Sequence, residues 1–268
     1  GVLVHQSRQF SLEAQEKARA ADELVTYMLE DLDKRLDEFD GVAKLDPGFN
    51  NALAYFEGLE TGDMSNETLA RYFDALTSAG DLRLREGKTA DALRLWDRSL
   101  DLSGRLVERD PNNASSWRRH GDAFVSLALA HWEEPEEIVL NTKEALQFFA
   151  KAAELDPHDF ANHGIQVTTL NNLGAGYTRL REFDAAKNTF LQSLAMNEDL
   201  RSRPWPESAN ATNRLLRQEA ETAGWMTEVE LHLGRAESAV EWHVREITIR
   251  REKIGNSGNP GRLGDGLA

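Results

Sequence analysis

The chain of 268 residues contains no cysteine, only 7 prolines and no long apolar run. The absence of cysteine excludes disulfides, thiolate nucleophiles and zinc sites with cysteine ligands. No apolar stretch reaches the ~18 residues that a membrane-spanning helix needs. The apolar opening GVLV is compatible with two interpretations: the end of a preceding membrane helix, or an ordinary start left after a tag is cleaved.

Positive charge is also scarce. The sequence has 31 Lys and Arg against 46 Asp and Glu, a formal net charge of -15 and a pI near 5.0. A nucleic-acid-binding domain needs a basic surface to neutralise phosphates, and docking on anionic lipid has the same requirement. We therefore predict no nucleic-acid partner and no direct membrane binding by this segment.

The pattern of apolar residues is helical throughout. Apolar positions recur three and four apart, and alternating Val, Ile and Thr runs between turn signals are missing. One apolar face consists of Val25, Met28, Leu29, Leu32, Leu36 and Phe39. Breaks such as Asp46-Pro47-Gly48, Asp110-Pro111 and Asp156-Pro157 separate the helical stretches. This spacing is typical of amphipathic helices and predicts an all-α protein.

The sequence also repeats itself. The segment AGDLRLREGKTADALRLWDRSL (79–100) matches LGAGYTRLREFDAAKNTFLQSL (173–194). Gly80, Ala92 and Trp96 recur as Gly174, Ala186 and Phe190 at identical spacing. A third copy contains Trp117, Gly121, Phe124, Ala145, Phe149, Ala152 and Pro157. A fourth, degraded copy contains Leu233-Gly234, Ala239, and Trp242 or His243. Repeats of this length predict stacked helical hairpins.

This pattern resembles the tetratricopeptide repeat, which has a large apolar residue, Leu-Gly and Tyr on a first helix and Ala, Phe and Ala on a second. The residues that fit it well are Leu170, Leu173, Gly174, Tyr177, Ala186 and Phe190. Glycine lets the two helices approach closely, and the aromatic fills the gap between neighbouring hairpins. The resemblance implies a right-handed α-solenoid of about four hairpins with extended helices and an N-terminal helical cap.

The repeats are longer than the family's usual 34 residues. Gly80 and Gly121 are 41 residues apart, and Gly121 and Gly174 are 53 apart. Seven additional residues are nearly two helical turns, so a helix can lengthen by seven without losing its packing phase. We place one extension in the helix that ends near Asp110, another at the start of the helix around 164–173, and an insertion of about twelve residues around 131–142.

The N-terminal segment carries a second resemblance. ARAADELVTYMLEDLDKRLDEFDGVAKLD, followed by ALAYFEGL, is similar to a helical segment that precedes tetratricopeptide repeats in large bacterial signalling proteins with kinase, TIR or cyclase-like effectors. The resemblance implies a bacterial signalling protein, either cytoplasmic or the extracytoplasmic part of a membrane-anchored chain. We predict an N-terminal helical segment at 1–62, repeats at 63–255 and a flexible glycine-rich tail at 256–268.

Candidate chemistry is sparse. No two of the 7 histidines lie four apart, and His158 and His163 have poor spacing for a metal. His120 takes a repeat position usually held by Leu, so we expect it to pack between helices. Phosphate-binding loops and the GxSxG nucleophile motif are missing. Acidic residues such as Asp31 and Asp37 are explained by a solvated helix face. We predict no catalytic activity, no metal site and no cofactor.

The family's concave groove is a site for proteins or peptides. The candidate groove residues are Arg85, Arg118, Arg119, Asp122, Asn171, Asn172 and Arg179. Arg118 or Arg119 with Asn172 is similar to part of the carboxylate clamp of some co-chaperones. Asp122 stands where that clamp has Asn, and Ala175 lacks a donor. The alternative is that these arginines pair locally with acidic neighbours.

Two questions stay open at this level. Trp205, between two prolines, is either displayed or plugs the junction between repeats, and the large area of tryptophan favours the plug. For function, the main hypothesis is a protein-interaction module that binds a protein or peptide partner in the groove. The alternative is a self-assembly scaffold, in which self-association brings attached effectors together. An enzyme on a helical-repeat scaffold is a third hypothesis, supported only by scattered carboxylates.

Overall fold

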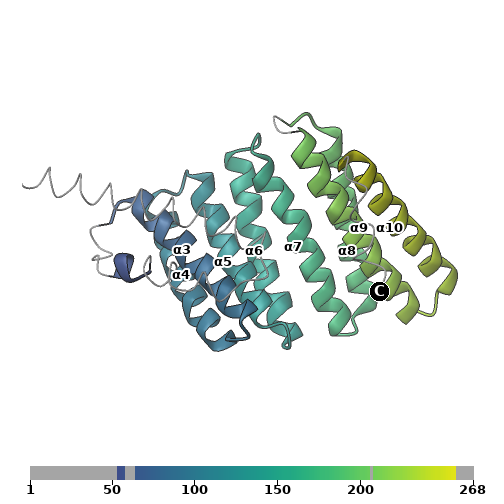
Figure 1. The fold of residues 1–268 in the computed structure, drawn as a ribbon, viewed down its shortest axis with the longest axis horizontal. Coiled ribbons are helices and arrows are strands. Elements are labelled where there is room, and N and C mark those ends of the chain that lie inside the picture. Colours follow the sequence, from purple (N-terminus) through teal and green to yellow (C-terminus); the bar gives the residue numbers. More distant parts are fainter. Residues whose placement is uncertain (1–52, 58–63, 206–207, 258–268) are drawn as a thin grey trace, which may run out of the picture. The chain divides into compact units, whose positions relative to one another are not determined.

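The computed structural model describes residues 53–57, 64–205 and 208–257 (Figure 1). Its helices are α3 (Asn66–Arg85), α4 (Thr89–Arg109), α5 (Ala114–Ala130), α6 (Pro135–Leu155), α7 (Phe160–Arg179), α8 (Phe183–Ser202), α9 (Ser208–His232) and α10 (Ala236–Ser257). No strand occurs in this part of the chain, which confirms the all-α prediction. The predicted cap and tail lie almost wholly outside the described residues.

The helices pack in consecutive pairs, as expected for a helical-repeat solenoid. The chain forms two compact units, divided between Pro111 and Asn112. The first contains the pair α3–α4, and the second contains α5–α6, α7–α8 and α9–α10. Within the second unit each pair also contacts the next, through α6 with α7 and α8 with α9, and the first helices of successive pairs touch as well.

The helices begin and end where the sequence supplies caps. The side chains of Ser65, Asn113 and Asp159 accept hydrogen bonds from backbone N–H groups in the first turns of α3, α5 and α7, which satisfies donors that no helical carbonyl reaches. Tight turns follow α3 and α9 at Gly87 and Gly234, with φ of 74° and 73°. Glycine adopts this left-handed conformation without a steric penalty.

Glycine–aromatic contacts hold three of the hairpins together, as predicted. A Cβ added at Gly80 would lie 2.3 Å from the Trp96 ring, and one at Gly174 would lie 2.4 Å from Phe190. At Gly121 the distance to Phe149 would be 2.6 Å. In each pair the ring of the second helix therefore rests on the bare backbone of the first.

The predicted insertion forms ordered helix. The turn falls at residues 131–134, directly before Pro135 starts α6, so residues 135–142 are helical. Trp96 follows Thr89, where α4 begins, by 7 residues, whereas Phe149 follows Pro135 by 14. The difference is almost two turns, which keeps the ring on the same face of a taller hairpin. α4 ends at Arg109 with Asp110 as its C-cap, as expected.

The fourth repeat differs from its predicted alignment. Gly234 lies in the turn between α9 and α10, where it corresponds to Gly87 and to Arg181, whose φ is also positive at 62°. It is therefore not the close-approach glycine of the first helix. Counting back from the turn places Thr227 at that position, seven residues earlier as for Gly80 and Gly174. The alignment by sequence was wrong here because glycine is used both at the turn with positive φ and at the close contact between the two helices.

Trp205 is a plug, as favoured by its size. Its ring packs edge-on to Phe160 with ring centroids 5.3 Å apart, and its Nε1 donates to the carbonyl of Leu200 at 2.8 Å. Val167 and Leu215 complete this cluster. The tryptophan thus joins α7, α8 and α9.

Candidate partner-binding site

Three of the predicted groove residues lie on α5. Arg118, Arg119 and Asp122 are all half-buried. Arg119 donates to the hydroxyl of Ser115 at 2.6 Å, so this arginine is held along its own helix. Arg118 differs, because its Nε atom is buried without a hydrogen-bond partner. A buried donor without an acceptor costs about 1–3 kcal/mol, so this nitrogen reduces stability where it lies.

Aromatic packing fixes α5 against α6 beside these residues. His120 lies edge-on to Phe148 with centroids 4.5 Å apart and to Phe124 at 5.4 Å. Trp117 stacks on Phe148 at 6.0 Å. Burial lowers the pKa of His120 from 6.5, because the charged imidazolium is disfavoured away from water. His120 is therefore a packing residue between helices, as predicted.

Asn171 is not an exposed groove residue. Only 1% of its surface is accessible. Its Oδ1 accepts from the hydroxyls of Ser193 at 2.7 Å and Thr222 at 2.9 Å, and its Nδ2 donates to the carbonyl of Gln218 at 3.4 Å. The prediction of exposure is wrong because α9 covers this position of α7. Asn171 instead joins α7, α8 and α9 through a buried polar network.

The other two candidates on α7 remain accessible. Asn172 is half-buried, and Arg179 is exposed at the end of the helix. The guanidinium of Arg179 lies 5.0 Å from the ring centroid of Trp132 and 3.5 Å from a carboxylate oxygen of Glu133. Because α5 also touches α7, the two helices offer partly exposed arginine and amide side chains within one unit.

Arg85 belongs to the other unit. It lies in the last turn of α3 and is exposed. The other candidate residues all belong to the second unit.

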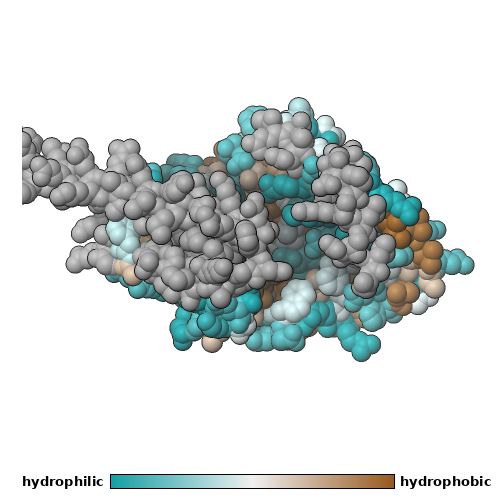
Figure 2. All heavy atoms as spheres, in the orientation of Figure 1, coloured by the Kyte–Doolittle hydropathy of each residue, from teal (hydrophilic) through white to brown (hydrophobic). Residues whose placement is uncertain are grey.

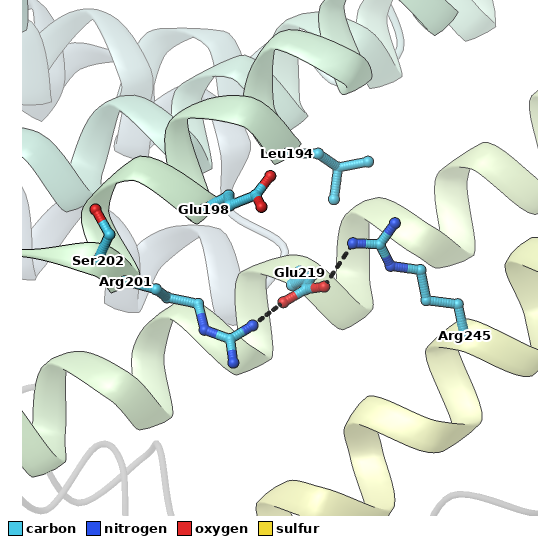
Figure 3. Close-up of a pocket in the computed structure, with 6 residues that line it drawn as sticks. All are labelled: Leu194, Glu198, Arg201, Ser202, Glu219 and Arg245. Atoms are coloured by element: carbon cyan, nitrogen blue, oxygen red, sulfur yellow. Dashed lines mark hydrogen bonds and ion pairs between the residues drawn. The ribbon is translucent and has the colours of Figure 1, made fainter.

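The structure also contains a hollow that the sequence did not predict (Figure 3). Its volume is about 440 Å³, and its lining residues are Leu194, Glu198, Arg201 and Ser202 on α8, Glu219 on α9 and Arg245 on α10. Arg201 and Arg245 donate to the two oxygens of the buried Glu219 carboxylate at 2.6 and 2.8 Å. One carboxylate thus connects both flanking helices. Partners 18 and 26 residues away leave no pattern within any single helix, so sequence reasoning missed it.

A second buried carboxylate serves a similar structural purpose. Glu230 on α9 has no accessible surface and accepts a hydrogen bond from Lys187 on α8. Arg235 lies 3.7 Å from its other oxygen. A buried charge is tolerated only when it is paired. These ion pairs therefore explain how α9 can bury the carboxylates of Glu219 and Glu230.

Within residues 53–57, 64–205 and 208–257, no group of three or more His, Asp or Glu side chains is arranged to hold a metal ion. In the same ranges, no helix is long and apolar enough to cross a membrane. What the site offers is hydrogen bonding and charge on a rigid helical surface.

Comparisons with known proteins establish the fold. No protein-family model and no curated protein matches the chain. It is similar to BtubC (BKLC) from P. vanneervenii, with a TM-score of 0.61 and 21% identity over 98% of this chain and 97% of that one. TTC0263, a thermophilic TPR protein in Thermus thermophilus, matches with a TM-score of 0.35, 19% identity and coverages of 80% and 92%. The human IFIT1 dimer with PPP-AAAA matches with a TM-score of 0.35, 14% identity and coverages of 84% and 55%.

Of these three similarities, the one to BtubC is high enough to bear on the fold, and at 21% identity it bears on nothing else. The glycine–aromatic pairs of three successive hairpins add the residue-level pattern. The chain is thus an α-solenoid of tetratricopeptide type.

Proposed function

We propose that this chain is a non-catalytic protein-interaction module, and that the accessible face of α5 and α7 binds a peptide or protein segment. The observation that carries the proposal is the partly exposed side chain of Arg118 on α5, which forms no ion pair within the described residues, while the contacting helix α7 carries the accessible Asn172. A guanidinium forms its strongest contacts with a planar anion such as a carboxylate. We therefore propose a partner segment with an acidic group.

The neighbouring residues fit this chemistry. Arg119 and Arg179 add positive charge, and the amide of Asn172 can donate to a backbone carbonyl of an extended chain. Asp122 limits the charge that the site can accept, which favours one carboxylate over a strongly acidic segment. Arg179 lies over Trp132, so an aromatic surface continues the site at one end.

The test compares three baits in source-cell lysate: the full chain, the double variant Arg118→Ala/Asn172→Ala, and a matched control, Arg94→Ala/Asn188→Ala. The control removes the same side-chain types at exposed positions of α4 and α8. We expect one protein to be retained by the parent and the control and lost by the double variant. Its binding segment should then bind the parent at least tenfold more tightly than the variant by calorimetry. Equal retention by all three baits overturns the proposed site.

We also propose that the module belongs to a larger bacterial signalling protein, because the segment 15–60 resembles the helical segment that precedes such repeats. That segment lies almost wholly outside the described residues. Sequencing the complete reading frame tests the proposal, and a frame without an effector domain would sink it.

A further inference from the structure

The face of α9/α10 that points away from α7/α8 is unusually apolar. The turn residues Arg181 and Gly234 are 53 residues apart, and the same shift relates equivalent positions of the two hairpins. In α7/α8, Phe190 and Thr178 are buried, and Phe190 stacks on Trp225 of the next hairpin with centroids 6.2 Å apart. The equivalents in α9/α10 are His243 and Leu231, both exposed.

Two valines on α10 extend this exposure. Val240 is 64% and Val244 56% accessible, although most valines in folded proteins are buried. Figure 2 shows apolar side chains gathering at the α10 end of the second unit. Val240 corresponds to Lys187, which reaches Glu230 of the following hairpin. Within the described residues, no further hairpin covers α10 in this way.

The exposed face of α10 has the spacing of a coiled-coil seam. Glu237, Val240, Val244, Ile247 and Arg251 follow one another at intervals of three and four residues, which places them on one stripe of the helix. The three apolar residues form its middle, and the two charged residues form its ends. Glu237 and Arg251 are exposed, and neither forms an ion pair within the described part of the chain.

Two other arginines of α10, by contrast, form ion pairs. Arg245 donates to Glu219 at 2.8 Å, and Arg250 donates to Glu246 at 2.8 Å. The first of these ion pairs joins α10 to α9, and the second lies within α10. Those pairs do not use Glu237 or Arg251.

The stripe is complementary to itself when reversed. Glu237 and Arg251 lie seven residues on either side of Val244. If a second α10 runs antiparallel about a two-fold axis at Val244, each Glu237 faces an Arg251, Val244 meets its own copy, and Val240 meets Ile247. The Glu237–Arg251 salt bridge therefore forms twice, as an isologous interface requires.

We propose that a second copy of this chain covers this face, through antiparallel pairing of the two α10 helices about Val244. This inference does not depend on the proposed partner site on α5 and α7. The self-complementary order of charges favours a second copy, because a segment of the same chain or an unrelated partner has no reason to match that order in reverse.

The test measures the mass of the full chain by light scattering across a dilution series. We expect a dimer of about 60 kDa, twice the protomer mass of 30.1 kDa, that dissociates on dilution. Either Glu237→Arg or Arg251→Glu places like charges together twice and should raise the dissociation constant at least tenfold. Asp184→Arg, at the equivalent exposed position of α8, is the matched control and should leave the dimer intact.

Restoring the dimer by exchanging the two charges tests whether Glu237 of one chain faces Arg251 of the other. An equimolar mixture of the Glu237→Arg and Arg251→Glu chains should form a heterodimer with both salt bridges restored, and the double variant should dimerise again by itself. A monomer at every concentration overturns the proposal, whether a segment of the same chain or another partner covers α10. A dimer that both single reversals leave unchanged, or one that mixing does not restore, overturns it as well. Circular dichroism confirms that each variant is folded.

Discussion

The hairpins α7/α8 and α9/α10 have the same helical arrangement, but they have different residues at the position where the two helices of a repeat approach most closely. In α7/α8, Gly174 receives the ring of Phe190, and no Cβ fits between them. At the equivalent positions α9/α10 has Thr227, which is half-buried, and His243, which is exposed. Ala186 and Ala239 are buried in both. Of these two hairpins, the close glycine–aromatic contact belongs to the one whose ring also stacks on the next pair.

The largest difference should appear when the two ring positions are truncated. Phe190→Ala removes a fully buried ring and should lower the free energy of unfolding by about 3–5 kcal/mol, because a cavity remains. His243→Ala should change it by no more than about 0.5 kcal/mol, as expected for a surface site. Urea unfolding at low protein concentration, followed by circular dichroism, compares the two. Similar losses would mean that His243 is also covered.

Adding a methyl group sharpens the same comparison. Gly174→Ala places a Cβ 2.4 Å from the Phe190 ring, and overpacking of this kind costs about 1–3 kcal/mol. The better helix propensity of alanine offsets about 1 kcal/mol, so we expect a net loss of up to about 2 kcal/mol. Thr227→Ala should be nearly neutral. In the Phe190→Leu background the effect of Gly174→Ala should shrink, and a double-mutant cycle measures that coupling. An unchanged effect in that background would contradict the steric explanation.

The buried amide is a further difference, because the position equivalent to Asn171 is Gly224 in α9. Asn171→Ala removes the acceptor that Ser193 and Thr222 share. Each hydroxyl keeps a backbone carbonyl, of Val167 and Gln218 respectively, so we expect a loss of about 1 kcal/mol. The adjacent Asn172→Ala should cost less than about 0.5 kcal/mol and should weaken partner binding instead. Thermal unfolding of the two variants separates them, and equal losses would place Asn172 in the core as well.

The sequence was sufficient for the hairpins because their determinants are local. Gly174 and Phe190 lie in one repeat, and the apolar period identifies both helices without knowledge of the rest of the chain. Local features also predicted the turn before Pro135, the packing of His120 and the burial of Trp205. The proline marks the turn, the repeat position of His120 indicates packing, and the large area of tryptophan favours burial.

The exposure of Asn171 could not be predicted for the opposite reason. Its partners Ser193 and Thr222 are 22 and 51 residues away, and the family pattern assigns a position to the groove without saying whether the next hairpin covers it. The hollow at Glu219 depends on three helices in the same way. Gly234 was misassigned because a glycine that allows a turn and one that allows close packing have the same letter.

The ion pairs at Glu219 should contribute less than the apolar contacts. Glu219→Gln removes the charge that both Arg201 and Arg245 contact. The side chains of these arginines are 37% and 47% accessible, so solvent screens the interaction, and we expect a loss of about 1 kcal/mol. The loss should shrink in high salt, whereas that of Phe190→Ala should not. A loss independent of salt would indicate packing as the cause.

The smallest effect concerns the pH dependence of stability that arises from the half-buried His120. Burial lowers the pKa of His120 in the folded state below its ordinary 6.5, so the folded protein binds a proton there less readily than the unfolded chain. The stability that depends on neutral His120 is therefore complete above pH 6.5 and is lost as the pH falls from there through the lower pKa of the folded state. His120→Phe should flatten the stability profile in this window. Unfolding midpoints measured at successive pH values test this, and a parent profile that matches His120→Phe throughout would show that the ring of His120 is hydrated despite its aromatic neighbours.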